Sequence, residues 1–108
     1  MASDKDDSGV VIGTDVDQEN EEELKEPEMY RVVMHNDHYT TMEFVVGVLR
    51  SIFHKPLLEA TRIMMDVHRK GRGNVGVYTY DIASTKVAQV NQKAREYEYP
   101  LKCTIEKA

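Results

Sequence analysis

The sequence contains one cysteine, Cys103, and no apolar segment approaching the roughly 18 residues of a membrane-spanning helix. A single cysteine excludes an internal disulfide bond, which fits a reducing compartment. The first seven residues are acidic and have no hydrophobic segment of a secretory signal, and their acidity is also atypical of a transit peptide. We therefore expect a cytoplasmic protein that does not associate with membranes.

The sequence also lacks the common signatures of a catalytic site. It has no glycine-rich phosphate-binding loop, and no serine or cysteine in the context of a nucleophile elbow. A Cys/His/Asp set exists in name as Cys103, His68 and Asp37, but Cys103 falls on the apolar side of an alternating segment. Thiols in such positions are usually unreactive, so we expect no enzymatic activity.

Charge is distributed unevenly along the chain. Residues 1–28 hold 11 acidic and 2 basic residues, whereas residues 29–108 hold 8 acidic and 12 basic residues. The first segment also lacks aromatic residues and a sustained apolar period, so it cannot bury enough surface to offset its conformational entropy. We predict a disordered acidic N-terminal extension over residues 1–28 and one folded domain over residues 29–108.

Apolar patterning in the second part predicts the element order β-α-α-β-α-β. The segments expected as strands are residues 30–34, 75–78 and 101–105. The residues expected at the helix starts are Thr40, Pro56, and Thr79 or Asp81. We predict an α+β fold, a small α/β sandwich in which three helices cover one face of a three-stranded antiparallel sheet.

Local signals predict where the helices begin and end. Thr40 is expected to be the N-cap of the first helix, with Glu43 completing a capping box. Gly71 and Gly73 are expected to stop the second helix. The apolar face of the third helix is expected to extend to Tyr97.

Polar side chains cluster where the first strand meets the first helix. Asn36, Asp37 and His38 follow the strand directly, and His68 ends the apolar stripe of the second helix. If the strand end lies beside that helix, amide, carboxylate and imidazole acceptors gather at one place. Such a cluster beside apolar residues suits a ligand with an ammonium group and a hydrophobic body. The alternatives are a half-buried His68 bonded to a backbone carbonyl, and an Asn36 that serves only as a turn residue.

The apolar candidates for such a pocket come from both helices. They are Met42, Val45, Met64 and Val67. Methionine adapts to ligands of varied shape, which favours a binding role. The alternative is that these residues belong to the core, which we expect in part for Val45 and Val67.

Two other kinds of site are conceivable. The residues His35, Asp37, His38 and His68 form the basis of a metal- or ligand-binding hypothesis, although a strand-to-turn spacing does not ensure that they converge. The segment 69–73 is basic, but it is short, two of its cations suit a helix C-terminus, and the acidic extension repels phosphates. We therefore expect no nucleic-acid binding.

Several separate motifs closely resemble the ClpS family. They are Asn36-Asp37-x-Tyr39-Thr40-x-Met42-Glu43-Phe44-Val45, Glu59-Ala60-Thr61-x-x-Met64-x-x-Val67-His68, Gly76-Val77-Tyr78-Thr79, Lys86-Val87 and Pro100-Leu101-x-Cys103. The resemblance runs in register from about Met29 to Lys107. It implies an adaptor of the bacterial AAA+ protease ClpAP that has no cofactor and no catalytic activity. Such adaptors recognise N-degrons, substrates whose first residue is Leu, Phe, Tyr or Trp, and deliver them to the ClpA unfoldase; we expect a monomer.

The resemblance also implies residue roles. Asn36 and His68 would hydrogen-bond the substrate α-ammonium group, with help from Asp37 and His38 in the loop. The residues implied for the hydrophobic pocket are Met34, Thr40, Met42, Val45, Met64, Val67 and Leu101, with Met42 as a gate against β-branched residues. The residues implied for contact with the ClpA N-domain, on another face, are Tyr39, Thr41, Asp81, Thr85 and Lys86. The N-terminal extension is expected to engage the unfoldase during delivery.

One departure from the family pattern concerns His38. The family usually has the motif Asn-Asp-Asp, and His38 replaces the second aspartate of that motif. The change removes a carboxylate that would face an ammonium ion. We expect weaker degron binding below about pH 6.5, where a protonated imidazole no longer accepts a hydrogen bond. A second hypothesis is a ClpS-like scaffold that still docks on the unfoldase but has lost degron binding through His38.

Overall fold

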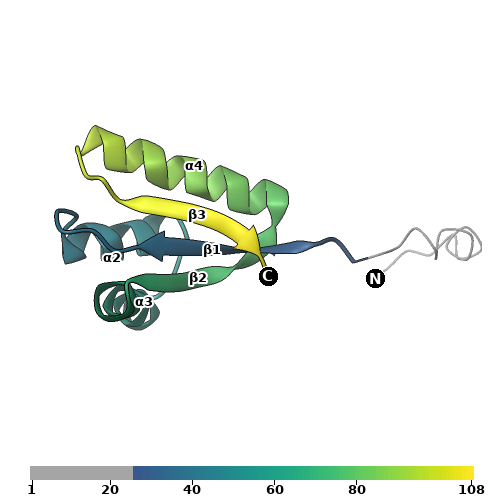
Figure 1. The fold of residues 1–108 in the computed structure, drawn as a ribbon, viewed down its shortest axis with the longest axis horizontal. Helices are drawn as coiled ribbons and strands as arrows, with labels where there is room; N and C mark the ends of the chain where they lie inside the picture. The colour runs from purple at the N-terminus through teal and green to yellow at the C-terminus, as the bar shows by residue number, and fades with distance from the viewer. Residues whose placement is uncertain (1–25) are drawn as a thin grey trace, which may run out of the picture.

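The computed structural model describes residues 26–108 of the chain. Its elements are β1 (Met29–His35), α2 (Met42–Ser51), α3 (Leu57–Lys70), β2 (Arg72–Thr79), α4 (Tyr80–Glu96) and β3 (Lys102–Lys107). The three strands form one antiparallel sheet in the order β2-β1-β3 (Figure 1). This confirms the predicted α+β fold and element order, whereas the predicted disorder of the acidic extension concerns residues that lie almost entirely outside the described part.

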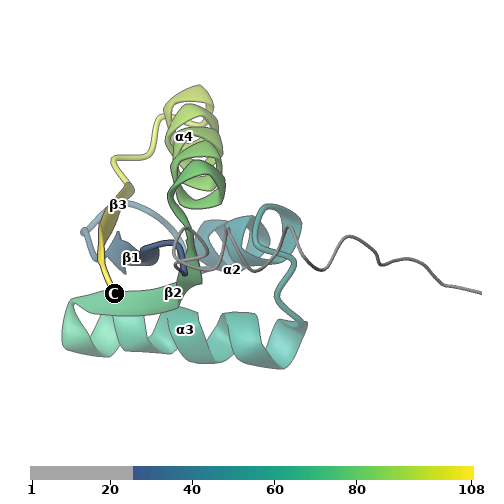
Figure 2. The same ribbon diagram turned by 90° about the vertical axis from the view of Figure 1, so that its right-hand side faces the viewer.

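The helices bury one face of the sheet. Helix α3 packs along β2, and α4 packs across the sheet against β3 and β1, with α2 beside α3 (Figures 1 and 2). Alternation along β1 sends Val32 and Met34 into this core, and both are fully buried. Within residues 26–108, none of the helices is both long and apolar enough to cross a membrane.

Each helix contributes an apolar stripe to the core. The buried residues of the stripes are Val45, Val48 and Leu49 in α2, Ala60, Ile63, Met64 and Val67 in α3, and Ala83, Val90 and Ala94 in α4. Tyr97 departs from its predicted place on the buried face. It is the C-cap of α4, is 59% exposed, and its ring centroid lies 5.3 Å from that of Phe44.

The predicted N-cap of the first helix is wrong by one residue. Thr41 is the N-cap of α2, and its hydroxyl accepts a hydrogen bond of 3.1 Å from the backbone N–H of Phe44. The hydroxyl and the backbone N–H of Thr40 instead donate to the carboxylate of Asp37, each at 2.7 Å. The expected capping box between Thr40 and Glu43 is therefore not formed.

Two glycines near the end of α3 have different functions. Gly71 ends α3 in a left-handed conformation with φ 89°, as predicted. Gly73 does not stop the helix but lies in β2, facing Met34. A Cβ atom at Gly73 would lie 2.6 Å from Cγ2 of Val67, so the close approach of β2 to α3 requires glycine.

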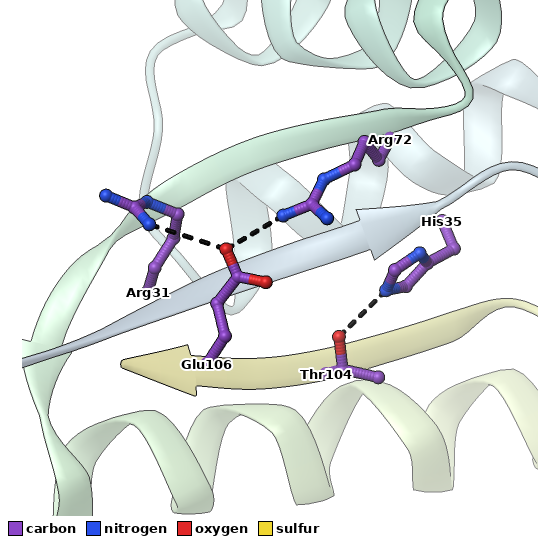
Figure 3. A network of polar contacts seen from close by, with 5 residues as sticks. All are labelled: Arg31, His35, Arg72, Thr104 and Glu106. Atoms are coloured by element: carbon purple, nitrogen blue, oxygen red, sulfur yellow. Dashed lines mark hydrogen bonds and ion pairs between the residues drawn. The ribbon is translucent and has the colours of Figure 1, made fainter. Parts of the chain in front are cut away.

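The opposite face of the sheet carries a polar network, drawn in Figure 3. Oε2 of Glu106 accepts from Nη2 of Arg72 at 2.8 Å and from Nη1 of Arg31 at 3.4 Å, and Nε2 of His35 lies 2.8 Å from Oγ1 of Thr104. Alternation along β1 places Val33 on this face, and its side chain is nevertheless fully buried. The long polar side chains thus exclude water from a valine that lies outside the helix-covered core.

Candidate functional site

A cavity of about 400 Å³ lies at the end of β1, between the loop that follows it and helices α2 and α3. Its lining residues are Asn36, Asp37, His38, Tyr39, Thr40, Thr41, Met42, Val45, Met64, Val67 and His68. The loop supplies most of the polar groups and the two helices supply the apolar ones. A volume of this size is within the range of about 300–1,000 Å³ that is usual for small-ligand sites.

One backbone hydrogen bond joins the residue that follows β1 to the C-cap of α3. The N–H of Asn36 donates to the carbonyl oxygen of Gly71 at 3.0 Å, which ties the end of β1 to the end of α3. Asn36 and His68, separated by 32 positions in the sequence, therefore line the same cavity. Both residues are exposed, so the alternative of a half-buried core histidine at position 68 is wrong.

Asp37 holds the loop in its conformation. Oδ1 accepts from the backbone N–H groups of Tyr39 and Thr40, each at 2.7 Å, and Oδ2 accepts from the Thr40 hydroxyl at 2.7 Å. Burial disfavours the charged form and is the largest single influence on the pKa of Asp37, but these hydrogen bonds together outweigh it and lower the pKa below 3.8. The cavity edge therefore carries a negative charge that is fixed by its own loop.

The apolar part of the cavity is shared with the core. Val45, Met64 and Val67 are 5%, 8% and 4% exposed, so each packs in the core and also lines the cavity. Met42 is 42% exposed and lies at the mouth, where a flexible side chain can move. Met34 and Leu101 are buried in the core and are absent from the lining, so their contact with a ligand stays a prediction.

The residues expected to contact a partner line two different hollows. Asp81, Thr85 and Lys86 lie together around a shallow hollow on α4, and Nζ of Lys86 donates to the carbonyl oxygen of Ile52 at 2.8 Å. Tyr39 and Thr41 line the cavity instead.

Tyr39 and Thr41 are thus cavity residues that sequence patterning did not assign to the pocket. Tyr39 is 76% exposed, and Thr41 is the N-cap of α2. The available signal was the Asp37 side chain, since an aspartate that bonds to the backbone two residues on curls the following loop. That curl turns residues 39–41 toward the cavity.

The metal-binding hypothesis fails on geometry. His35 belongs to the polar network on the outer face of the sheet (Figure 3). Asp37, His38 and His68 line the cavity instead. In the part of the chain that the structure describes, no three His, Cys, Asp or Glu side chains converge as metal ligands. Burial, followed by the charges of Arg72 and Lys102, lowers the pKa of His35 below 6.5.

The nominal Cys/His/Asp set is also not assembled. Cys103 is buried in the core opposite Met34 in the sheet, whereas His68 is exposed at the cavity. Burial raises the pKa of Cys103 to about 12, so the thiol stays protonated and unreactive at neutral pH.

Comparisons with known proteins agree on one family. The family model "ATP-dependent Clp protease adaptor protein ClpS" matches residues 25–104. The ATP-dependent Clp protease adapter protein ClpS of Syntrophus aciditrophicus is 66% identical over 86 residues, which cover 80% of each chain. That of Acetivibrio thermocellus is 55% identical over 93 residues, which cover 86% of this chain and 94% of the relative.

A solved structure supports the same relationship. It is Agrobacterium tumefaciens ClpS2 bound to L-phenylalaninamide, which superposes with a TM-score of 0.74 at 37% identity and covers 77% of this chain and all of the other. The fold, the family model and the relatives therefore agree. This chain belongs to the ClpS family of ATP-dependent Clp protease adaptor proteins.

Proposed function

We propose that this protein is an adaptor that binds N-degron substrates and delivers them to a ClpA unfoldase. The substrates are polypeptides with a free α-amine and Leu, Phe, Tyr or Trp as the first residue. The observation that carries the proposal is the cavity of about 400 Å³ with polar acceptors at one end and apolar side chains within. L-phenylalaninamide, the ligand of the A. tumefaciens relative, has the free amine and the apolar side chain that such a cavity would bind.

Amine recognition would depend on Asn36 and His68. The Asn36 side-chain oxygen and a neutral His68 imidazole accept hydrogen bonds, and an ammonium group has three donors. Asp37 contributes negative charge, but its oxygens are already bonded to Thr40 and Tyr39, so its second role is to hold the loop. His38 would supply a further imidazole acceptor at the polar end of the cavity.

The first side chain of the substrate would occupy the apolar part of the cavity. Val45, Met64 and Val67 form a preformed wall because each is fixed by core packing. Thr40 lies at the edge, and Met42 acts as a gate against β-branched side chains. Met34 and Leu101 would support the wall from behind.

Delivery would use surfaces outside the apolar part of the cavity. Asp81, Thr85 and Lys86 on α4 are proposed to contact the ClpA N-domain, together with Tyr39 and Thr41. The N-terminal extension would engage the unfoldase. In this proposal the protein acts in the cytoplasm as a monomer with no catalytic activity and no cofactor, and binds neither nucleic acid nor membrane.

Fluorescence anisotropy with a labelled peptide that begins with Phe, compared with its N-acetylated form, tests the proposal. Acetylation removes the positive charge and N–H donors of the amine, so acceptors that the bound peptide covers are left without partners and we expect a loss of at least about 100-fold in affinity. Equal affinity of the two peptides would overturn the proposal. Addition of a chelator distinguishes the metal-binding alternative, because an adaptor keeps its affinity.

A further inference from the structure

A second hollow continues from the cavity along the surface between α2 and α3. This α2–α3 groove has a volume of about 430 Å³. The lining residues that matter here are Met42, Val46, Gly47, Leu57, Thr61 and Met64. Met42 and Met64 line both the groove and the cavity, so the two hollows adjoin each other.

The groove is suited to an uncharged apolar group. Leu57 is 54% exposed and Met42 is 42% exposed, which leaves apolar surface in contact with water. The hydroxyl of Thr61 donates to the carbonyl oxygen of Leu57 at 2.8 Å, so it has no free donor to offer. The charged lining residues are Glu43 and Arg50, one of each sign, so the groove favours neither an acidic nor a basic ligand.

Gly47 keeps the groove open. It is an exposed residue in the middle of α2, and a Cβ atom there would meet no heavy atom within 4 Å. Glycine is unfavourable inside a helix relative to residues with a side chain. Neither the backbone conformation nor core packing requires glycine at this position. The effect of the missing side chain is to leave the groove unfilled.

A peptide that leaves the cavity along α3 passes over the groove. The amine would be held at Asn36 and His68, near the C-terminal end of α3, and the groove extends from Met64 toward Leu57 at the other end of that helix. Met64 and Leu57 are separated by about 10 Å along the helix axis. An extended peptide advances about 3.3 Å per residue with alternating side chains, so its third residue lies about 7 Å from the first and on the same side.

We propose that the α2–α3 groove binds an apolar side chain at the third position of the N-degron substrate. The inference rests on the proposed function, because the amine fixes where the peptide begins. It adds a specificity element beyond the first residue: among substrates with the same first residue, those with an apolar third residue bind more tightly.

Three labelled peptides that differ only near the N-terminus test this inference. They begin Leu-Ser-Ser-Ser, Leu-Leu-Ser-Ser and Leu-Ser-Leu-Ser. Partial burial of one leucine side chain predicts about fivefold tighter binding of the third peptide relative to the first. The inference is overturned if the first and third peptides bind equally, or if leucine at the second position gives the larger gain.

Two variants assign the effect to the groove. Gly47→Leu fills the groove and should abolish the gain from the third-position leucine, whereas Ala88→Leu adds the same side chain at an exposed position of α4 and should preserve it. Persistence of the gain in Gly47→Leu contradicts the inference. N-acetylated versions of all three peptides separate the two proposals. If acetylation does not weaken the binding of these peptides, the proposed function is contradicted. If acetylation weakens binding but the free-amine first and third peptides bind equally, only the groove inference is contradicted.

Discussion

The outer face of the sheet and the cavity differ in what their polar side chains bind. On the outer face, Glu106 bridges Arg31 and Arg72, and His35 is paired with Thr104 (Figure 3). At the cavity, the side chains of Asn36 and His68 form no hydrogen bond with other groups of residues 26–108 and are exposed. Paired groups maintain the fold, whereas acceptors beside an apolar cavity are available to a ligand.

This difference matters because the same residue type occurs on both sides. His35 and His68 are both polar residues at the ends of apolar segments, and the sequence alone does not separate their roles. Their partners in the folded protein do. The comparison predicts that changes on the outer face affect stability and that changes at the cavity affect binding.

The largest expected effect comes from His68→Ala compared with His35→Ala. Loss of His68 removes an acceptor of the ammonium group, so affinity for a Phe-initiated peptide should fall about 100-fold with less than about 0.5 kcal/mol change in stability. Loss of His35 should destabilise the fold by about 1 kcal/mol and leave affinity unchanged. Fluorescence anisotropy measures the affinity and urea unfolding measures the stability. A loss of affinity in His35→Ala together with a loss of stability in His68→Ala would contradict the assigned roles.

The close contact between β2 and α3 gives the next largest effect. Gly73→Ala places a Cβ atom 2.6 Å from Cγ2 of Val67, so neighbouring atoms must shift. We expect a loss of about 1–3 kcal/mol in the free energy of unfolding, measured by urea denaturation. An unchanged midpoint would mean that β2 and α3 are not in tight contact.

Gly47→Ala is the substitution matched to Gly73→Ala, and we expect it to increase stability rather than lower it. The added methyl group meets no neighbour within 4 Å, and alanine favours the helix. The free energy of unfolding should increase by about 0.5–1 kcal/mol in the same denaturation experiment. A decrease would show that the added methyl group does meet a neighbour.

The smallest effect concerns pH. The pKa of His35 is lowered in the folded protein, first by burial and then by Arg72 and Lys102, so the unfolded chain binds a proton more readily. The contribution of His35 to stability is therefore complete above pH 6.5 and declines as pH falls through the lowered value. Wild type should lose more stability than His35→Gln between pH 7.5 and pH 5, measured by thermal unfolding; equal losses would exclude this role.

Much of the fold was predictable because local sequence patterns indicate where its helices and strands lie. The order of elements followed from apolar periodicity, and Gly71 ended α3 as its conformation requires. The cap of α2 was wrong because Thr40 and Thr41 are both plausible N-caps, and only the bonds from Thr40 to Asp37 decide between them. Such a choice depends on the folded loop rather than on the local sequence.

The site was predictable in composition but not in arrangement. Asn36, Met42 and His68 were candidates from residue type and spacing, and they do line one cavity. The bond from Asn36 to Gly71 that brings them together joins segments distant in sequence, which no local pattern reports. Likewise, no local pattern reports that Tyr39 lines this cavity whereas Lys86 lines a hollow on α4.

The most direct test of the central claim is calorimetric titration of the wild-type protein with a peptide that begins with Leu or Phe and with its N-acetylated form. We expect the free-amine peptide to bind with one site per chain and acetylation to weaken binding by at least about 100-fold, because Asn36 and His68 lose their donor partners. Equal binding of the two peptides would contradict it.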